Sequence, residues 1–269
     1  MKINNLNKVI VPIAGLGTRL LPATKAIPKE MLPVVNKPII QYVVEEIIEA
    51  GFKEIIFITH SSKSSVENHF DQSFELETVL KKRVKRRLLK EVKSISNLKI
   101  SIQTIRQGQA LGLGHAILCA KPIVQKEPFA VVLPDMLIKK INEKNDLFEL
   151  KKEFEKSGKS QILVGRIQKK DVSSYGIVKL QNHLIKSIVE KPSLKKAPSN
   201  LFVIGRYIFK NDFFKYLKNN KSSNSGEFEL TSAIQSFIKD NNEIYSRKLS
   251  GNYYDCGNKL GYLKAIVDY

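Results

Sequence analysis

The 269-residue chain has few cysteines and no long apolar run. Its two cysteines, Cys119 and Cys256, cannot form a disulfide framework and lack the spacing of metal ligands, so they are expected to be reduced thiols. No stretch approaches membrane-spanning length. The apolar run after Lys8 ends in a glycine loop without a cleavage site. We therefore expect a cytoplasmic protein without a membrane span or an export signal.

Acidic residues are also scarce relative to basic ones. Lysine and arginine number 45 against 26 aspartate and glutamate residues, which gives a net charge of +19. Such an excess favours polyanionic partners. Much of it lies between Leu80 and Lys93, where apolar residues recur at helical spacing and predict one amphipathic helix with a basic outer face. This segment lacks interleaved aromatics and the chain lacks a nucleic-acid motif, so a solvated surface is favoured over a nucleic-acid interface.

Three familiar motifs are missing from the sequence. There is no Walker A loop and no G-x-S-x-G nucleophile elbow, and Leu20 stands where a dinucleotide fingerprint needs its third glycine. The stretch VIVPIAGLGTRLLPATKAIPKEMLP nevertheless places Gly15 and Gly17 directly after a buried strand, and Arg19 and Lys29 follow. Glycines at a strand end let backbone N–H groups approach an anion, and nearby cations strengthen its binding. A polyphosphate site is favoured over a surface turn.

Short apolar strands alternate with helical segments through the first half of the chain, which predicts an α/β fold with a mostly parallel, mixed sheet flanked by helices. In such sheets ligands bind beyond the carboxyl ends of the strands. Three features fall at strand ends, namely the glycine loop, the Gly108–Gly114 turn and Asp135. The second half contains four further strands and a helix in FELTSAIQSFIKDN, and YYDCGNKLGYLKAIVDY is expected to form a turn followed by a short helix. No linker divides the chain.

Two carboxylates are candidates for holding a metal ion beside the phosphates. Asp135 ends a strand and Asp255 lies in a glycine-flanked turn, and carboxylate oxygens suit a metal used in phosphoryl chemistry. Either residue alone is more simply explained as a turn cap. Glu190 and Lys191 stand between a strand and a proline, where they could accept a hydroxyl group and contact a phosphate, although such a dipeptide is more often a surface ion pair.

The sequence closely resembles the bacterial UTP–glucose-1-phosphate uridylyltransferases, a branch of the sugar-phosphate nucleotidyltransferase superfamily. The resemblance runs from about Lys8 to Tyr269 and depends on GLGTRLLPATKAIPKEMLP, RQGQALGLGHA, LPDM, VEKP, APSNLFVIGRY and DCGNKLGY. It implies a Rossmann-like catalytic domain over residues 1–269, with nucleotide-binding residues up to about 140 and sugar-phosphate-binding residues from about 141. The implied reaction joins UTP and glucose 1-phosphate into UDP-glucose and releases pyrophosphate, with Mg²⁺ as cofactor.

The resemblance also implies a role for each matching residue. Asp135 and Asp255 would hold Mg²⁺, and Glu30, Gln107 and the backbone at Gly112 would contact the uracil edge. The implied catalytic residues are Arg19, Lys29, Asp135 and Lys191. The implied nucleotide-binding residues are Ala14, Gly15, Gly17, Thr18, Arg19, Lys29, Glu30, Gln107 and Gly112. The implied sugar-phosphate-binding residues are Gly176, Glu190, Lys191 and Gly205.

The chain departs from the family pattern at three places. Ser232 replaces an acidic residue in LTSAI, the stretch between Tyr175 and Glu190 is short, and many relatives continue beyond the position of Tyr269 with a helical segment that makes subunit contacts. The first two departures leave the implied catalytic set intact. A homo-oligomer is expected, and the third departure leaves its size open.

Two other interpretations remain open from the sequence. A non-catalytic protein that binds nucleotide or nucleic acid could keep this fold, but it would not need both Asp135 and Asp255. Within the enzyme class, transfer of a thymidylyl group is the alternative base specificity.

Overall fold

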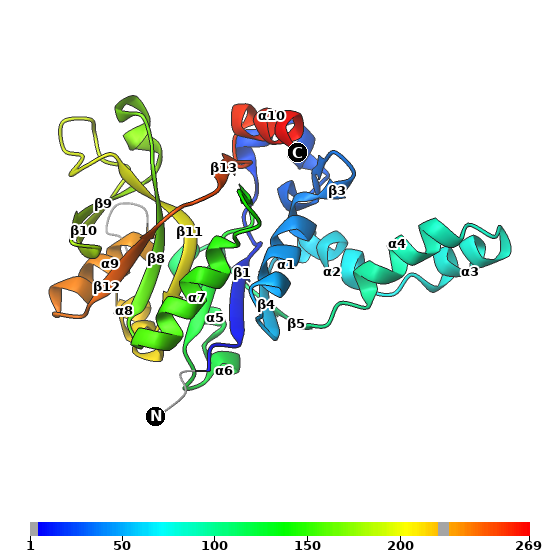
Figure 1. Cartoon of the computed structure of the whole chain (residues 1–269), viewed down its shortest axis with the longest axis horizontal. Coiled ribbons are helices and arrows are strands. Elements are labelled where there is room, and N and C mark those ends of the chain that lie inside the picture. Colours follow the sequence, from blue (N-terminus) through cyan, green and yellow to red (C-terminus); the bar gives the residue numbers. More distant parts are fainter. Residues whose placement is uncertain (1–4, 220–225) are drawn as a thin grey trace.

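The protein is described here by a computed structural model covering residues 5–219 and 226–269, with a nine-stranded sheet at its centre (Figure 1). The strand order is β5–β4–β1–β6–β11–β8–β12–β10–β9. The bounds of these strands are β1 Lys8–Pro12, β4 Glu54–Thr59, β5 Ser101–Arg106, β6 Phe129–Val132, β8 Ser160–Arg166, β9 Gly176–Gln181, β10 Leu184–Glu190, β11 Leu201–Phe209 and β12 Ile244–Lys248. Two small antiparallel pairs join β7 (Met136–Lys139) to β13 (Asn252–Asp255) and β2 (Pro33–Val34) to β3 (Lys37–Pro38).

Helices cover both faces of the sheet. The helix bounds are α1 Ile39–Glu49, α2 Ser64–Phe70, α3 Phe74–Lys82, α4 Arg86–Ser96, α5 Leu113–Cys119, α6 Lys121–Val124, α7 Asp146–Ser157, α8 Phe214–Asn219, α9 Leu230–Lys239 and α10 Lys259–Asp268. Apolar residues of α1, α2, α7 and α10 belong to the core on one face, and those of α5, α6, α8 and α9 belong to the core on the other. None of the helices in these described ranges is both long enough and apolar enough to cross a membrane.

The first half of the sheet explains why short apolar runs become strands. Along β1, Val9 and Val11 face the α1 side while Ile10 faces the α5 side, and all three are fully buried. A strand covered on both faces needs apolar residues at every position, which is the pattern of a buried parallel strand. β1 pairs in parallel with β4 and β6, and β4 pairs in parallel with β5.

The second half of the sheet turns antiparallel. β11 runs antiparallel to both β6 and β8, and β10 runs antiparallel to both β12 and β9, while β12 is parallel to β8. The α/β fold with a mixed sheet is therefore confirmed. Its parallel strands β5, β4, β1 and β6 end together at one edge, which gathers the loops that follow them.

The prediction of a single basic helix from Leu80 to Lys93 is wrong. The chain forms α3 and α4 instead, and it reverses between them at Val84, whose φ of 52° lies in the left-handed region. The reversal lays the helices against each other as an arm that projects from the body (Figure 1), and Lys93 on α4 lies 3.8 Å from Glu77 on α3. A continuous helix would have stacked like charges one turn apart, and the reversal separates them.

Besides the two-residue strands β2 and β3, three strands were not predicted from the sequence. β12 lies inside the sheet, and β7 and β13 pair beside the site, so part of the predicted turn at YYD is a strand. Each is short, and each contains polar residues that weaken its pattern. Their partners are distant in sequence, so tertiary pairing decides their conformation.

Candidate active site

Two adjoining cavities lie beyond the carboxyl ends of β1 and β6. The glycine-loop cavity, of about 410 Å³, is lined by residues following β1, β5 and β6. The carboxylate cavity, of about 650 Å³, is lined by residues near the ends of β6, β9, β10 and β13, by residues of β11, and by the segment that enters α9. The two cavities share Leu113, Leu133, Asp135 and Glu227 as lining residues. A ligand in either cavity would therefore lie beside the same two carboxylates, Asp135 and Glu227.

The glycine loop is held in one conformation by local contacts. Gly17 has a φ of 69°, which glycine adopts without strain, and a Cβ there would lie 3.2 Å from the Lys29 side chain. Thr24 Oγ1 donates a hydrogen bond of 2.8 Å to the Gly17 carbonyl. Gly15 and Thr18 line the cavity formed by this loop. The sequence therefore builds a fixed turn with room for an anion close to its backbone.

An ion pair joins the loop cations to the strand-end carboxylate. Lys29 Nζ lies 2.6 Å from Asp135 Oδ2, with 17% of the lysine side chain and 24% of the aspartate side chain exposed. Burial alone would lower the pKa of Lys29, but Asp135 and Glu30 raise it above its ordinary value. Burial alone would raise the pKa of Asp135, but Lys29 holds it below its ordinary range. Both groups are therefore charged at neutral pH. The contribution of the pair to the free energy of folding is lost as pH falls through the lowered pKa of Asp135.

The second predicted metal ligand is oriented by two hydrogen bonds. Asp255 Oδ2 accepts one of 3.0 Å from the Tyr175 hydroxyl, and Asp255 Oδ1 accepts one of 2.9 Å from the Gly257 amide. Burial and the adjacent Asp255 raise the pKa of Tyr175, so this hydroxyl stays protonated and remains a donor.

Asp135 and Asp255 approach each other beside Gly257. A Cβ built at Gly257 would lie 3.0 Å from Asp135 Oδ2 and 3.0 Å from Asp255 Oδ1, so glycine at this position keeps a side chain out from between the two carboxylate oxygens. Among the described residues, no cluster of three or more His, Cys, Asp and Glu side chains could hold a metal ion. Two carboxylates with water and phosphate oxygens are the coordination that Mg²⁺ commonly takes in proteins. Lys29 already bonds one of these oxygens, so a metal ion would share it.

The carboxylate cavity gathers the other predicted acidic and basic groups. Lys191 Nζ lies 3.4 Å from Glu190 Oε1, and 57% of the lysine side chain is exposed. Gly176 is closely packed, because a Cβ there would lie 3.1 Å from the Thr231 side chain and 3.4 Å from Glu190 Oε2. Gly205 has a φ of 70° and lies against the Leu133 side chain. The carboxylate cavity therefore has both acidic and basic side chains in its lining. Its lining includes Gly176, Glu190, Lys191, Gly205, Arg19 and Asp255.

The Gln107 side chain and the Gly112 backbone meet in the glycine-loop cavity. Gln107 Nε2 donates a hydrogen bond of 3.2 Å to the Gly112 carbonyl. Gly114 donates its amide to the Phe228 carbonyl at 2.7 Å, and the Phe228 amide bonds Leu111 at 2.8 Å. A Cβ at Gly114 would lie only 2.6 Å from that Phe228 oxygen. The glycine turn is thus fixed by close backbone contact with the segment before α9.

Glu30 lies apart from the other predicted residues. It is 1% exposed and accepts a hydrogen bond of 2.8 Å from Lys63, and it lines neither cavity. Burial raises the pKa of Glu30, although Lys29 and Lys63 oppose this change. Its contact with a base therefore stays a prediction. The structure gathers the other predicted site residues around the two cavities.

Some lining residues were missed from the sequence. Glu227 borders both cavities, and Tyr207 and Thr231 border the carboxylate cavity. Glu227 directly precedes the predicted helix in FELTSAIQSFIKDN, and no motif in the sequence marks it as a site residue. Tyr175 could have been found, because it directly precedes the predicted Gly176.

The fold and the site define an α/β protein with two adjoining cavities beyond the carboxyl ends of its parallel strands, and comparison with known proteins shows its family. Residues 8–269 match the model of the nucleotidyl transferase family, and the chain belongs to that family. A UTP–glucose-1-phosphate uridylyltransferase of Haemophilus ducreyi is 50% identical over 97% of this chain and 92% of its own.

Solved structures resemble the chain along nearly its whole length. A UTP-bound UDP-glucose pyrophosphorylase from Acinetobacter baumannii superposes with a TM-score of 0.91 at 44% identity, covering 98% of this chain and 93% of its own. A UDP-glucose pyrophosphorylase complexed with UDP-glucose gives a TM-score of 0.87 at 38% identity, covering 98% of each chain.

Proposed function

We propose that this protein makes UDP-glucose and pyrophosphate from UTP and glucose 1-phosphate. The observation that carries the proposal is that the two cavities adjoin and share Asp135 and Glu227, so a nucleotide in one and a sugar phosphate in the other would meet beside these carboxylates. The names of the relatives, one bound to UTP and another to UDP-glucose, support the same substrates.

The glycine-loop cavity is assigned to UTP. Its loop offers backbone N–H groups and Lys29 supplies positive charge in the cavity, while Arg19 lines the adjoining carboxylate cavity, from which it could reach the triphosphate. Gln107 and the Gly112 backbone also line the glycine-loop cavity, where a base edge could bond them. Thymidylyl transfer remains the alternative specificity, because these groups could also meet the similar edge of thymine.

The carboxylate cavity is assigned to glucose 1-phosphate. Glu190 accepts hydrogen bonds from sugar hydroxyls, and Gly176 and Gly205 line the same cavity. Lys191 contacts the phosphate. In the reaction, an oxygen of this phosphate forms a bond to the α-phosphorus of UTP, and the bond from that phosphorus to the β-phosphate oxygen breaks to release pyrophosphate. No covalent intermediate with the protein is needed, so catalysis consists of positioning two anions and neutralising their charge.

Mg²⁺ is assigned to Asp135 and Asp255. The two carboxylates both lie beside Gly257, and the ion's chemistry would be to offset negative charge on the phosphates. Tyr175 and the Gly257 amide hold the Asp255 carboxylate in orientation. The ion pair with Asp135 keeps the Lys29 ammonium beside the phosphates.

Pyrophosphate release tests the proposal directly. Purified protein is incubated with glucose 1-phosphate and each of the four ribonucleoside triphosphates or dTTP, with Mg²⁺ or with EDTA. We expect release to be fastest with UTP and to stop with EDTA. Faster release with dTTP would support the alternative specificity, and no release with any triphosphate would contradict the proposal.

A further inference from the structure

An arginine occupies a core position in β11. Arg206 is 0% exposed in a strand whose other residues are apolar or glycine, and it alternates with Ile204 and Ile208, which belong to the core facing α1. A buried guanidinium is costly unless its charge and its donors are satisfied. Its presence in the middle of a buried strand therefore needs a reason beyond packing.

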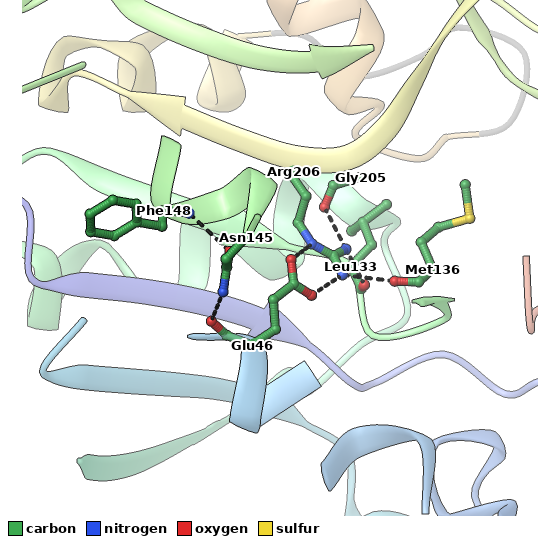
Figure 2. A network of polar contacts seen from close by, with 7 residues as sticks. All are labelled: Glu46, Leu133, Met136, Asn145, Phe148, Gly205 and Arg206. Atoms are coloured by element: carbon green, nitrogen blue, oxygen red, sulfur yellow. Dashed lines mark hydrogen bonds and ion pairs between the residues drawn. The ribbon is translucent and has the colours of Figure 1, made fainter. Parts of the chain in front are cut away.

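The Arg206 guanidinium is satisfied from two sides, as Figure 2 shows. Toward α1 it bonds Glu46 through both carboxylate oxygens, with Nε at 3.0 Å and Nη2 at 2.6 Å. Toward the turn after β6 it donates to the Leu133 carbonyl at 3.1 Å and to the Met136 carbonyl at 2.7 Å. Such a planar fork has donors in fixed directions that a lysine ammonium cannot reproduce.

The two carbonyls lie on either side of Asp135. Leu133 and Met136 are the ends of the turn that carries this carboxylate from β6 to β7, and the guanidinium joins both ends. The Leu133 amide also bonds the Gly205 carbonyl at 2.9 Å, which ties the turn to the residue before Arg206. The guanidinium thus restrains the backbone on both sides of the carboxylate without contacting the carboxylate itself.

We propose that Arg206 is a positioning residue that fixes the Leu133–Met136 turn, so that Asp135 faces the metal and the phosphates. This inference rests on the metal role proposed for Asp135. A site that must hold a carboxylate in one place requires supporting contacts of this kind. Stability alone would not require the arginine, because an apolar pair at 46 and 206 could fill the same space without buried charges.

The test separates positioning from stability with two variants. The double variant Arg206→Met with Glu46→Leu removes both charges and the two bonds to the turn, so no charge is left buried alone. The single variant Glu46→Gln weakens the ion pair but leaves the guanidinium bonded to both carbonyls. Binding of Mn²⁺ is measured by electron paramagnetic resonance, turnover by pyrophosphate release, and stability by thermal unfolding.

We expect opposite patterns for the two variants. The double variant should unfold near the parent's temperature but bind Mn²⁺ at least tenfold more weakly, with a similar loss of kcat. Glu46→Gln should unfold at a lower temperature yet stay within about threefold of the parent in Mn²⁺ affinity. A purely structural role predicts instead that Mn²⁺ affinity follows thermal stability in both variants.

A control removes a second ion pair far from the site, which joins a buried lysine to a partly exposed glutamate. Lys8 Nζ lies 2.6 Å from Glu127, and this pair stands at the start of β1, at the end opposite the cavities. Lys8→Met with Glu127→Leu should leave Mn²⁺ affinity unchanged. If the folded Arg206→Met/Glu46→Leu variant has the Mn²⁺ affinity and the kcat of the parent, the positioning role of Arg206 is wrong. That result would leave the proposed metal role of Asp135 untouched. A parent that is fully active in EDTA would contradict the proposed metal role as well.

Discussion

The cations of the active site and those of the α3–α4 arm differ in surroundings, although both regions are rich in lysine and arginine. Lys29 is largely buried and lies 2.6 Å from Asp135. Arg87 on the arm also pairs with a carboxylate, Glu91 at 3.1 Å, but 91% of its side chain is exposed. An exposed pair of this kind contributes little, and salt screens it further.

The comparison shows that charge count does not locate function in this chain. The net charge of +19 draws attention to the arm, where many cations lie close together. The site has fewer cations, but Lys29 faces Asp135 in a partly closed cavity, where electrostatic interactions are stronger than in water. Burial and a carboxylate partner, rather than the number of charges, distinguish Lys29 from the cations of the arm.

The largest expected effect is at Asp135. Asp135→Asn should nearly abolish pyrophosphate release, because a neutral amide is a poor metal ligand and leaves Lys29 without its partner. Asp240→Asn serves as the control, since Asp240 is exposed at the end of α9 and bonds Tyr216. Full turnover of Asp135→Asn would contradict the metal assignment.

A smaller effect is expected at Lys191, which is in the site but more than half exposed. Lys191→Ala should raise the KM for glucose 1-phosphate by about tenfold, as the loss of one charged hydrogen bond predicts. The KM for UTP should change less. Both KM values are measured by titrating each substrate at a saturating concentration of the other. If Lys191→Ala raises only the KM for UTP, the assignment of Lys191 to glucose 1-phosphate is wrong.

The smallest effect is expected on the arm. Replacing Lys82, Arg86 and Arg87 together by glutamine should leave turnover within a few-fold of the parent, because exposed charges far from the site are screened at physiological salt. Turnover and binding to duplex DNA are measured on the same preparation. A large loss of activity, or tight duplex binding that the variant loses, would support a nucleic-acid role instead.

Strong local patterns made much of the fold predictable. β1, β4 and β6 are apolar runs bounded by turns, and α1 has helical periodicity and stops before Gly51, so each was predicted. The arm was predicted wrongly because spacing alone could not reveal the reversal at Val84. β7 and β13 were missed because their pairing depends on residues far apart in the chain.

The site was predictable where its residues follow strands directly. Asp135 and the glycine loop were found in this way, and Asp255, Glu190 and Lys191 were candidates from their places in turns. Resemblance to a family assigned their roles and added Glu30, Gln107, Gly176 and Gly205. Arg206 was not singled out, although an arginine inside LFVIGRYIF is a signal that the sequence contains. Its partner Glu46 could not be inferred, because that pairing joins α1 to β11 only through the fold.

One matched pair of variants tests the central claim most directly. Lys29→Gln and Lys82→Gln each remove one positive charge, the first beside Asp135 and the second on the exposed arm. The kcat for pyrophosphate release is measured for both at saturating UTP and glucose 1-phosphate. We expect Lys29→Gln to lower kcat on the order of a hundredfold, as the loss of an electrostatic contact to the reacting phosphates does, and Lys82→Gln to leave it unchanged. Equal values of kcat for the two variants would contradict the account.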